Sequence, residues 1–273
     1  RCRRGIGERE MISAKSPREI ATMKQAGKIV ALARAAVAAA IAPGVTTKQL
    51  DRIAERVIRQ QGASPSFKGY GGFPASICTS INSVLVHGIP DQTALKDGDL
   101  ISIDIGACYK GYHGDAAWTF AVGRVSEEAV RLMEVTRQSL FIGLEQAKPG
   151  NRLSDISHAI GDFVEAHGYS VPIDYTGHGI GTHLHEEPAI PNFGSPGKGI
   201  LLKEGMTFAI EPMVHAGKPH TRVLADDWTV VTKDGSLAAH YEHTIVITHD
   251  GYEILTINPD EEEDSVYGQT GCH

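Results

Sequence analysis

The sequence predicts an α+β fold made of two similar halves, each with two helices followed by antiparallel strands, around a central antiparallel sheet. Three observations support this prediction. Apolar residues recur at helical spacing after residue 46, and apolar and polar residues alternate along 100–120. The same order of elements then recurs about 106 residues later. We therefore expect one domain over 11–258, with repeats at about 16–120 and 126–250, packed about a pseudo-two-fold axis.

Composition narrows the class of protein. A hydrophobic content of 41% and a formal charge of −7 over 273 residues fit a globular protein and argue against a general nucleic-acid binder, which needs a basic surface. No apolar run is long enough to span a membrane. The four cysteines have no paired spacing, so the sequence predicts neither a disulfide framework nor a thiolate zinc site, and a reducing cytoplasm fits. We interpret residues 1–10 as a flexible leader and 259–273 as a disordered acidic tail.

Local signals predict where the first two helices begin. Ser16 and Glu19 flank Pro17 as a capping box, and that helix would run to the stop signal Pro43-Gly44. Thr46 and Gln49 form a second candidate capping box. The apolar stripe of the second helix comprises Leu50, Ile53, Ala54, Val57 and Ile58.

The second half repeats these features. Pro43-Gly44 reappears as Pro149-Gly150. Each half also contains a Leu-Lys-acid-Gly segment whose Leu precedes an acidic residue by nine positions, Asp104 in the first half and Glu211 in the second. The repeated apolar stripe comprises Ile156, Ala159, Ile160, Phe163 and Val164. An internal duplication explains the shared offset, and it predicts that carboxylates from both halves meet near the axis.

The strands over 100–120 carry two of these carboxylates. A turn centred on Tyr109-Lys110 would make Asp104 and Asp115 directly opposed residues, with Cβ atoms roughly 5 Å apart. Such a pair is tolerated when it shares a proton or holds a cation, and the alternative is an exposed hairpin whose acids face water.

Further candidate ligands lie in the second half. Glu211 precedes Pro212, which forces an extended backbone, and Glu242 lies in a predicted strand. Four converging acids require positive charge, which a metal supplies. His178 adds an imidazole, although a single histidine is more often structural. Oxygen and nitrogen donors without Cys suit Mn²⁺, Fe²⁺, Co²⁺ or Zn²⁺, and this many carboxylates favours two bridged ions roughly 3.5 Å apart.

Five motifs in order, NSVLVHGIP, SIDIG with YHGD, GHGIGTHLHEEP, FAIEPM and YEHTIVIT, resemble the type I methionine aminopeptidases of pita-bread fold, from about residue 11 to 258. The resemblance implies that His87 and His185 are catalytic, contacting the scissile amide and its carbonyl oxygen, and that Glu211 shuttles a proton. The implied metal ligands are Asp104, Asp115, His178, Glu211 and Glu242, of which Asp115 and Glu242 bridge. The implied methionine pocket comprises Phe67, Tyr70, Phe73, Cys78, Leu184 and Trp228.

The resemblance implies removal of N-terminal methionine from nascent proteins and peptides, preferably before a small second residue. Two divalent ions, Co, Mn, Fe, Zn or Ni, with a bridging hydroxide would serve the reaction. Further expectations are a monomer in the cytoplasm, contact with the ribosome surface, and no stable nucleic-acid or membrane partner. The remaining histidines are expected to be structural or on the surface: His113, His158, His167, His215, His220, His240, His243 and His249, with His273 in the tail. His183 alternates with His185 and could compete as a ligand.

Three alternative interpretations of the sequence have to be compared with this one. Aminopeptidase P and prolidase share the metal ligands but usually carry a large extra domain before the catalytic one. Type II methionine aminopeptidases carry an insertion between His185 and Glu211, and the 26 positions that separate these residues leave no room for it. A binding protein that had lost the chemistry should have broken ligands, whereas all of the implied ones are intact.

Overall fold

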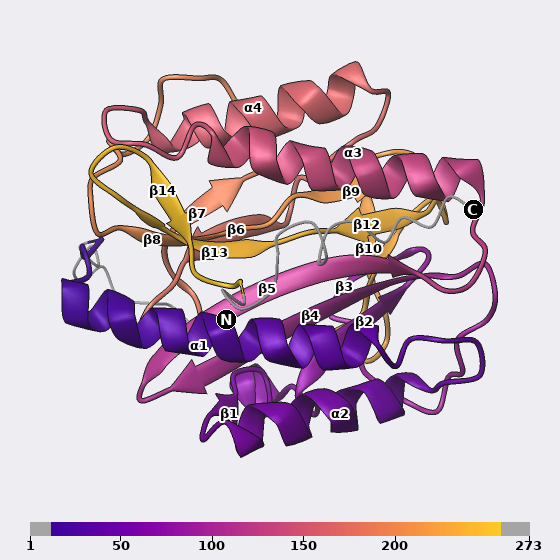
Figure 1. The fold of residues 1–273 in the computed structure, drawn as a ribbon. Helices are drawn as coiled ribbons and strands as arrows, with labels where there is room; N and C mark the ends of the chain where they lie inside the picture. Colours follow the sequence, from indigo (N-terminus) through magenta and orange to yellow (C-terminus); the bar gives the residue numbers. More distant parts are fainter. Residues whose placement is uncertain (1–11, 258–273) are drawn as a thin grey trace.

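The computed structural model describes residues 12–257, so the expected leader at 1–10 and the acidic tail at 259–273 lie outside the described residues. Helices α1 (Pro17–Ala38) and α2 (Thr47–Gln60) cover one side of a central layer of strands. Helices α3 (Glu127–Leu144) and α4 (Leu153–Ala166) cover the other side (Figure 1). The architecture is the predicted α+β arrangement of two helix–helix–sheet halves.

All strand pairings in the described part of the chain are antiparallel. One sheet contains β1, β4, β2 and β5, and another has the order β14-β13-β8-β6-β7. Two small sheets have the orders β10-β11-β3 and β12-β9. The strands are β1 (Ser64–Pro65), β2 (Ile77–Ile81), β3 (Val84–Val86), β4 (Leu100–Tyr109), β5 (Tyr112–Ala121), β6 (Thr176–Gly179), β7 (Glu186–Pro191), β8 (Thr207–Ile210), β9 (Met213–His215), β10 (Thr221–Val223), β11 (Val230–Thr232), β12 (Ala238–His240), β13 (His243–Ile247) and β14 (Tyr252–Ile254), with a short 3-10 helix at Tyr70–Gly72.

The two halves correspond closely. Helices α2 and α4 each have 14 residues, and both their first and last residues are 106 positions apart. Gly44 and Gly150, which precede them, have φ values of 90° and 94°, a conformation that favours glycine. Each half also ties the start of its second helix to the segment before its main strand, through the bridges Thr46↔Ala94 and Arg152↔Leu201.

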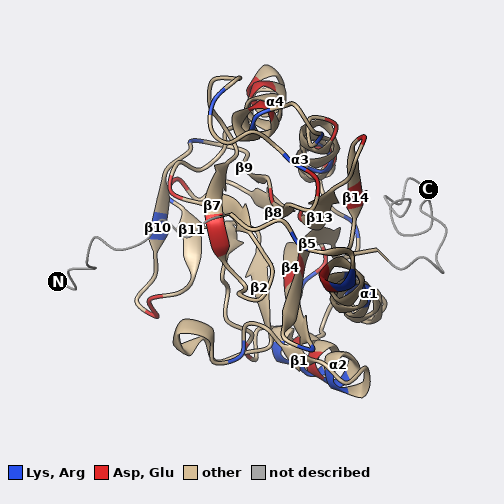
Figure 2. Ribbon diagram, turned by 90° about the vertical axis from the view of Figure 1, so that its left-hand side faces the viewer, with Lys and Arg blue, Asp and Glu red and all other residues tan. Residues whose placement is uncertain are grey.

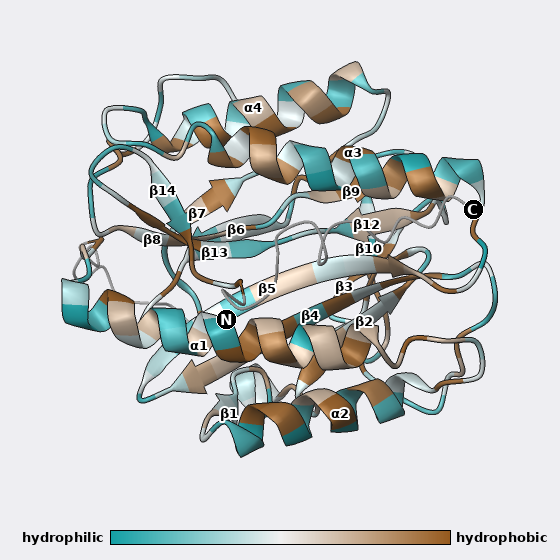
Figure 3. Ribbon diagram, viewed as in Figure 1, coloured by the Kyte–Doolittle hydropathy of each residue, from teal (hydrophilic) through white to brown (hydrophobic). Residues whose placement is uncertain are grey.

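Both predicted capping boxes are present. The Ser16 hydroxyl accepts from the N–H of Glu19, and Thr46 and Gln49 cap α2 in the same way. Helix α1 ends at Ala38, before Pro43, and a turn at residues 39–40 follows it. Figure 3 shows that the helices carry both hydrophilic and hydrophobic positions. In α2 the hydrophobic side includes Leu50, Ala54 and Ile58, which have no exposed surface. Burial of a side chain such as Leu50 stabilises the fold by about 1.5–3 kcal/mol.

The hairpin of β4 and β5 corrects one prediction. Tyr109 pairs with Tyr112, so the turn is centred on Lys110-Gly111 and not on Tyr109-Lys110. Both turn residues have positive φ, 49° and 81°, as a two-residue hairpin turn with the twist of its strands requires. Asp104 therefore pairs with Ala117, and Asp115 with Gly106. The two acids are diagonal neighbours on one face of the hairpin, not directly opposed residues.

Helix α1 packs on this hairpin at a very close distance. A Cβ atom on Gly114 in β5 would lie only 2.9 Å from the backbone nitrogen of Gly27 in α1. Glycine is required at this crossing because no side chain fits between the helix and the strand. The close approach fixes the position of β5 and therefore of Asp115.

Candidate metal centre

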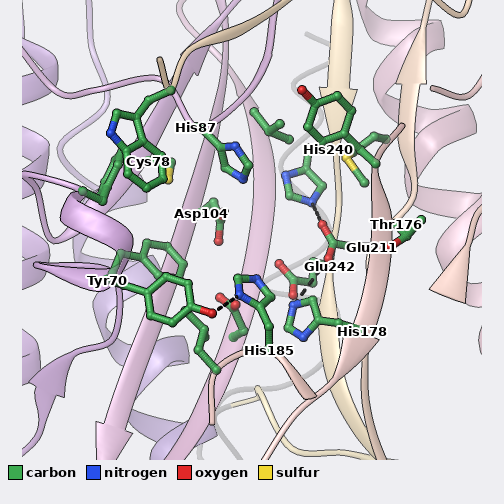
Figure 4. Close-up of a pocket in the computed structure, with 18 of the residues that line it drawn as sticks. Tyr70, Cys78, His87, Asp104, Thr176, His178, His185, Glu211, His240 and Glu242 are labelled. Atoms are coloured by element: carbon green, nitrogen blue, oxygen red, sulfur yellow. Dashed lines mark hydrogen bonds and ion pairs between the residues drawn. The ribbon is translucent and has the colours of Figure 1, made fainter. Parts of the chain in front are cut away.

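A cavity of about 300 Å³ lies among strands from both halves. All of the residues expected to have a site role line this cavity. Figure 4 shows that acids and imidazoles from both halves point into it. The complete lining is Phe67, Tyr70, Phe73, Cys78, Val86, His87, Asp104, Asp115, Asp174, Tyr175, Thr176, His178, Leu184, His185, Glu211, Met213, Trp228, His240 and Glu242. The alternative of an exposed hairpin is wrong, because Asp115 is only 4% exposed.

Hydrogen bonds across the two halves hold the acids in place. The N–H of Asp115 donates to Thr244 Oγ1 at 2.9 Å, and that hydroxyl donates back to the carbonyl of Asp115 at 2.8 Å. The N–H of Glu242 donates to the carbonyl of Ala117 at 2.8 Å. Strand β5 of the first half is thereby joined to the segment of the second half that carries Glu242.

The four carboxyl groups line the same cavity, and burial affects the pKa of each one. Burial raises the pKa of Asp104 to about 7 and that of Glu211 to about 8. Burial, reinforced by the neighbouring acids, raises the pKa values of Asp115 and Glu242 well above the ordinary range. Asp104 Oδ1, Asp115 Oδ1 and Glu242 Oε1 are buried without a hydrogen-bond partner among the described residues. Buried polar atoms of this kind need a partner, and a divalent cation would satisfy them together.

His178 has the hydrogen bonding expected of a metal ligand. Its Nδ1 donates to the carbonyl of Gly179 at 2.8 Å, which leaves Nε2 unprotonated and facing Glu211 Oε1 at 3.5 Å. Burial lowers the pKa of His178 to about 3, so the ring is neutral at physiological pH. A neutral imidazole oriented through its other nitrogen is suited to bind a metal ion.

Two groups of three side chains could each hold an ion. The ligand atoms of Asp115, His178 and Glu242 lie within 4.8 Å of one another, and so do those of Glu211, His240 and Glu242. Asp104 belongs to neither group but lines the same cavity. The donors are oxygen and nitrogen without sulfur, which fits first-row divalent ions.

His240 is the residue that the sequence interpretation missed. It was expected to be structural or on the surface, but it is buried, lines the cavity and has its Nε2 3.3 Å from Glu211 Oε2. One signal was available, because His240 precedes Glu242 by two positions and alternation along a strand places such residues on the same face. His183 contributes nothing comparable, since it is exposed and belongs to neither group of ligands.

Figure 4 shows His87 next to Asp104 and His185 next to His178. His87 has a φ of 60°, uncommon for a residue with a side chain, and burial lowers its pKa to about 4. The Nδ1 atom of His185 is hydrogen-bonded to the Tyr70 hydroxyl at 2.7 Å, and its ring packs edge-on against His178 with centroids 4.3 Å apart. Burial also lowers the pKa of His185, so both rings are neutral near pH 7.

Aromatic and apolar side chains complete the cavity. Phe73 and Trp228 pack edge to face with ring centroids 5.1 Å apart. Tyr70 is 44% exposed and lies at the rim. Cys78 is buried, and burial raises the pKa of its thiol strongly, so the thiol is protonated and unreactive.

Charged residues elsewhere gather mainly on the helices and in loops, as Figure 2 shows. None of the helices within residues 12–257 combines the length and the apolar character needed to cross a membrane.

Comparisons with known proteins agree with this geometry. Residues 21–249 match the model of metallopeptidase family M24. The chain is 58% identical over 246 residues to methionine aminopeptidase 1 of Bacillus subtilis, covering 90% of this chain and 99% of that protein. The crystal structure of methionine aminopeptidase from Thermotoga maritima superposes with a TM-score of 0.89 at 48% identity, covering 90% of this chain and 100% of that one. The prolidase from Pyrococcus furiosus has a TM-score of 0.75 at 25% identity, and the match covers 90% of this chain but 66% of that one. The chain therefore belongs to metallopeptidase family M24 and, within it, to the type I methionine aminopeptidases.

Proposed function

We propose that this protein is a dinuclear metallo-aminopeptidase that removes the N-terminal methionine from nascent proteins and peptides, preferably when the second residue is small. One observation carries the proposal: a single cavity is lined by buried acids, a neutral imidazole and apolar side chains. Carboxylate oxygens of Asp104, Asp115 and Glu242 in this cavity have no hydrogen-bond partner among the described residues. The five side chains that would hold two divalent ions are Asp104, Asp115, His178, Glu211 and Glu242. Co, Mn, Fe, Zn and Ni all suit this donor set. Bound ions would supply a bridging hydroxide as nucleophile and polarise the scissile carbonyl.

The chain's own residues provide the remaining steps. His185, fixed by Tyr70, is oriented to stabilise the oxygen that gains charge as the carbonyl is attacked. Glu211 is suited to carry a proton near neutral pH, since burial raises its pKa to about 8. His87 also lines the cavity, where it can contact the departing amide nitrogen.

The pocket beside the acids fits a methionine side chain. Its lining is apolar and partly aromatic, as suits a flexible thioether: Phe67, Tyr70, Phe73, Cys78, Leu184 and Trp228.

The physiological setting is part of the same proposal. A monomer in the cytoplasm would meet nascent chains at the ribosome surface, without a stable nucleic-acid or membrane partner. Sedimentation with ribosomes and gel filtration of the full chain test these two points. Binding to ribosomes that persists after the nascent chains are released would support surface contact.

Peptide cleavage with defined metals tests the chemistry. Met-Ala-Ser and Xaa-Pro peptides are incubated with the protein plus Mn²⁺ or Co²⁺, and released free amino acids are measured. The proposal predicts methionine release from the first peptide, and two ions per chain by elemental analysis. The matched variant Asp115→Asn should lose both bound metal and turnover. Cleavage of Xaa-Pro peptides alone, or full activity of Asp115→Asn, would contradict the proposal.

A further inference from the structure

The loop between β10 and β11 brings Trp228 to the cavity. The two strands are antiparallel neighbours at one side of the molecule (Figure 2). Among residues 221–232, all of which the structure describes, Trp228 alone lines the cavity. The position of its ring therefore depends on the conformation of residues 224–229.

This loop is closed by two backbone hydrogen bonds and contains one unusual backbone conformation. The N–H of Leu224 donates to the carbonyl of Thr229 at 2.8 Å, and the N–H of Asp227 donates to the carbonyl of Leu224 at 3.1 Å. Asp227 has a φ of 61°, in a region that residues with a side chain rarely adopt. Such a conformation persists only where surrounding contacts hold it, so the loop needs contacts beyond these two bonds.

The carboxylate of Asp226 supplies them. Its Oδ1 accepts from the N–H of Trp228 at 3.0 Å and from the N–H of Thr229 at 2.8 Å, and its Oδ2 accepts from the Thr229 hydroxyl at 2.6 Å. An aspartate that binds backbone N–H groups two and three positions ahead fixes the turn between them. These bonds, above all the one from the Thr229 hydroxyl, lower the pKa of Asp226, so the acceptor is charged at neutral pH. Asp226 is exposed and does not line the cavity.

Inside the cavity, the ring of Trp228 is closely surrounded. It packs edge to face on Phe73 with ring centroids 5.1 Å apart, and it lies edge-on to His87 with centroids 6.5 Å apart. A Cβ atom on Gly71 would lie only 3.2 Å from Cη2 of the ring. Because a packed interior leaves little free space, a shift of the Trp228 backbone changes the shape of the pocket that its ring bounds.

We propose that Asp226 is a positioning residue for substrate specificity: from outside the cavity, its carboxylate fixes Trp228 and thereby the shape of the pocket that receives the methionine side chain. The inference rests on the proposed function, because it takes this pocket as the site of that side chain. A pocket discriminates between side chains of similar volume only if its walls keep one position. Loss of the Asp226 carboxylate should therefore weaken both the fit to methionine and the preference for methionine over leucine.

The variant Asp226→Ala tests this role in the full chain. KM for Met-Ala-Ser should rise by about tenfold, the order that one methylene group contributes in an apolar pocket. The preference for Met-Ala-Ser over Leu-Ala-Ser, measured as the ratio of kcat/KM values, should fall by about the same factor. The kcat for Met-Ala-Ser should stay within about threefold of the parent's, because Asp226 does not touch the reacting atoms. A parental KM in a folded Asp226→Ala protein overturns the proposal.

The conservative variant Asp226→Asn tests whether hydrogen bonding is what the carboxylate supplies. The asparagine amide oxygen can still accept from the N–H groups of Trp228 and Thr229. KM for Met-Ala-Ser should therefore stay within about threefold of the parent's. A KM as high as that of Asp226→Ala would overturn the proposal.

Asp234→Ala is the matched control. Asp234 is also exposed and accepts from the N–H of Lys218 at 2.7 Å, and from the N–H and the hydroxyl of Ser236 at 3.1 and 2.7 Å. It follows β11, whereas Asp226 precedes it, and it does not line the cavity. Asp234→Ala should lower the unfolding free energy to a similar extent and keep the parental KM. An equal rise of KM in both variants would attribute the effect to destabilisation and overturn the proposal.

Hydrogen exchange in the unmodified full chain does not depend on how a variant folds. The N–H groups of Trp228 and Thr229 should exchange at least about tenfold more slowly than in an unstructured peptide of the same sequence, because the carboxylate holds them. A parent chain that releases methionine but exchanges both N–H groups at the peptide's rate would overturn this inference alone. A parent chain that releases no methionine would contradict the proposed function, and the inference with it.

Discussion

A buried ion pair supports the segment that brings His185 into the cavity. Lys15 Nζ donates to Glu186 Oε2 at 2.7 Å, and the two side chains are only 6% and 18% exposed. Glu186 also accepts from the N–H of His183 at 3.1 Å, and Lys15 donates to Ser13 Oγ. The carboxylate of Glu186 thus organises the loop just before β7, and Lys15 neutralises it.

The substitution Lys15→Met removes the charge and keeps the length of the side chain. Removal of one partner of a buried pair leaves an uncompensated charge and typically costs 3–5 kcal/mol. Because Glu186 keeps the His183 N–H and some exposure to water, we expect a loss of unfolding free energy of about 3 kcal/mol. Peptide turnover should also fall, since the loop carries His185, while metal content stays unchanged.

The same pair predicts how this loss varies with pH. Burial alone would raise the pKa of Glu186, but the hydrogen bonds from Lys15 and His183 hold it below its ordinary value of 4.5. A carboxyl group with a depressed pKa stabilises the fold above pH 4.5, and that contribution is lost as the pH falls through the lower pKa of the folded state. The difference between the parent and Lys15→Met should therefore be largest at neutral pH and shrink in acid.

The chain offers a matched control in Lys24→Met. Lys24 and Glu253 form a pair of nearly the same length, 2.8 Å, but both side chains are 46% exposed. Exposed pairs contribute about 0–1 kcal/mol, so Lys24→Met should change stability by less than about 1 kcal/mol. Urea unfolding at pH 7, followed by circular dichroism, measures both variants. Equal losses in the two variants would refute the argument from burial.

Three further predictions concern the cavity and its support. His185→Ala should lower kcat by about 100-fold or more with metal still bound. Steady-state kinetics and metal analysis measure these two quantities, and an unchanged kcat would contradict the proposed role of His185. Gly114→Ala should destabilise the protein by about 1–3 kcal/mol, because its Cβ would lie 2.9 Å from the backbone nitrogen of Gly27; a thermal melt equal to the parent's would refute this. In the metal-free protein, Glu211 keeps its proton to about pH 8 when folded but ionises near 4.5 when unfolded. Unfolding free energy should therefore fall by up to about 1.4 kcal/mol per unit between pH 7 and 8, and denaturant titrations that show a rise would contradict it.

The sequence predicted the helices best where the signals were local. Ser16 and Thr46 begin their helices as expected, because a capping box is formed by residues three positions apart. The end of α1 was placed too late, at Pro43 instead of Ala38, because the last turn before a stop signal can leave the helix without any residue that marks the change. The repeat supplied the long-range information, since it predicted that Asp104 and Glu211 approach one cavity.

The register of the β4–β5 hairpin could not be predicted from the alternation of polar and apolar residues. Alternation fixed which residues of β4 and β5 share a face, and this part was correct for Asp104 and Asp115. The pairing depends on which two residues form the turn, and Lys110 adopts a φ of 49° that its side chain gives no reason to expect. A shift of the turn by one position kept both acids on the same face and changed them from opposed to diagonal neighbours.

His240 shows why residue identity and residue orientation are predictable to different degrees. Its spacing from Glu242 could have identified it, since alternate residues of an extended segment face the same way. The strands β12 and β13, however, belong to different sheets and are separated at Glu242, so alternation alone could not have placed the ring. What places it is Thr119, 121 positions earlier in the chain, which binds both backbone groups of His240. Orientation at a seam between two halves is set by such cross-half contacts, which leave no periodic signal in either half.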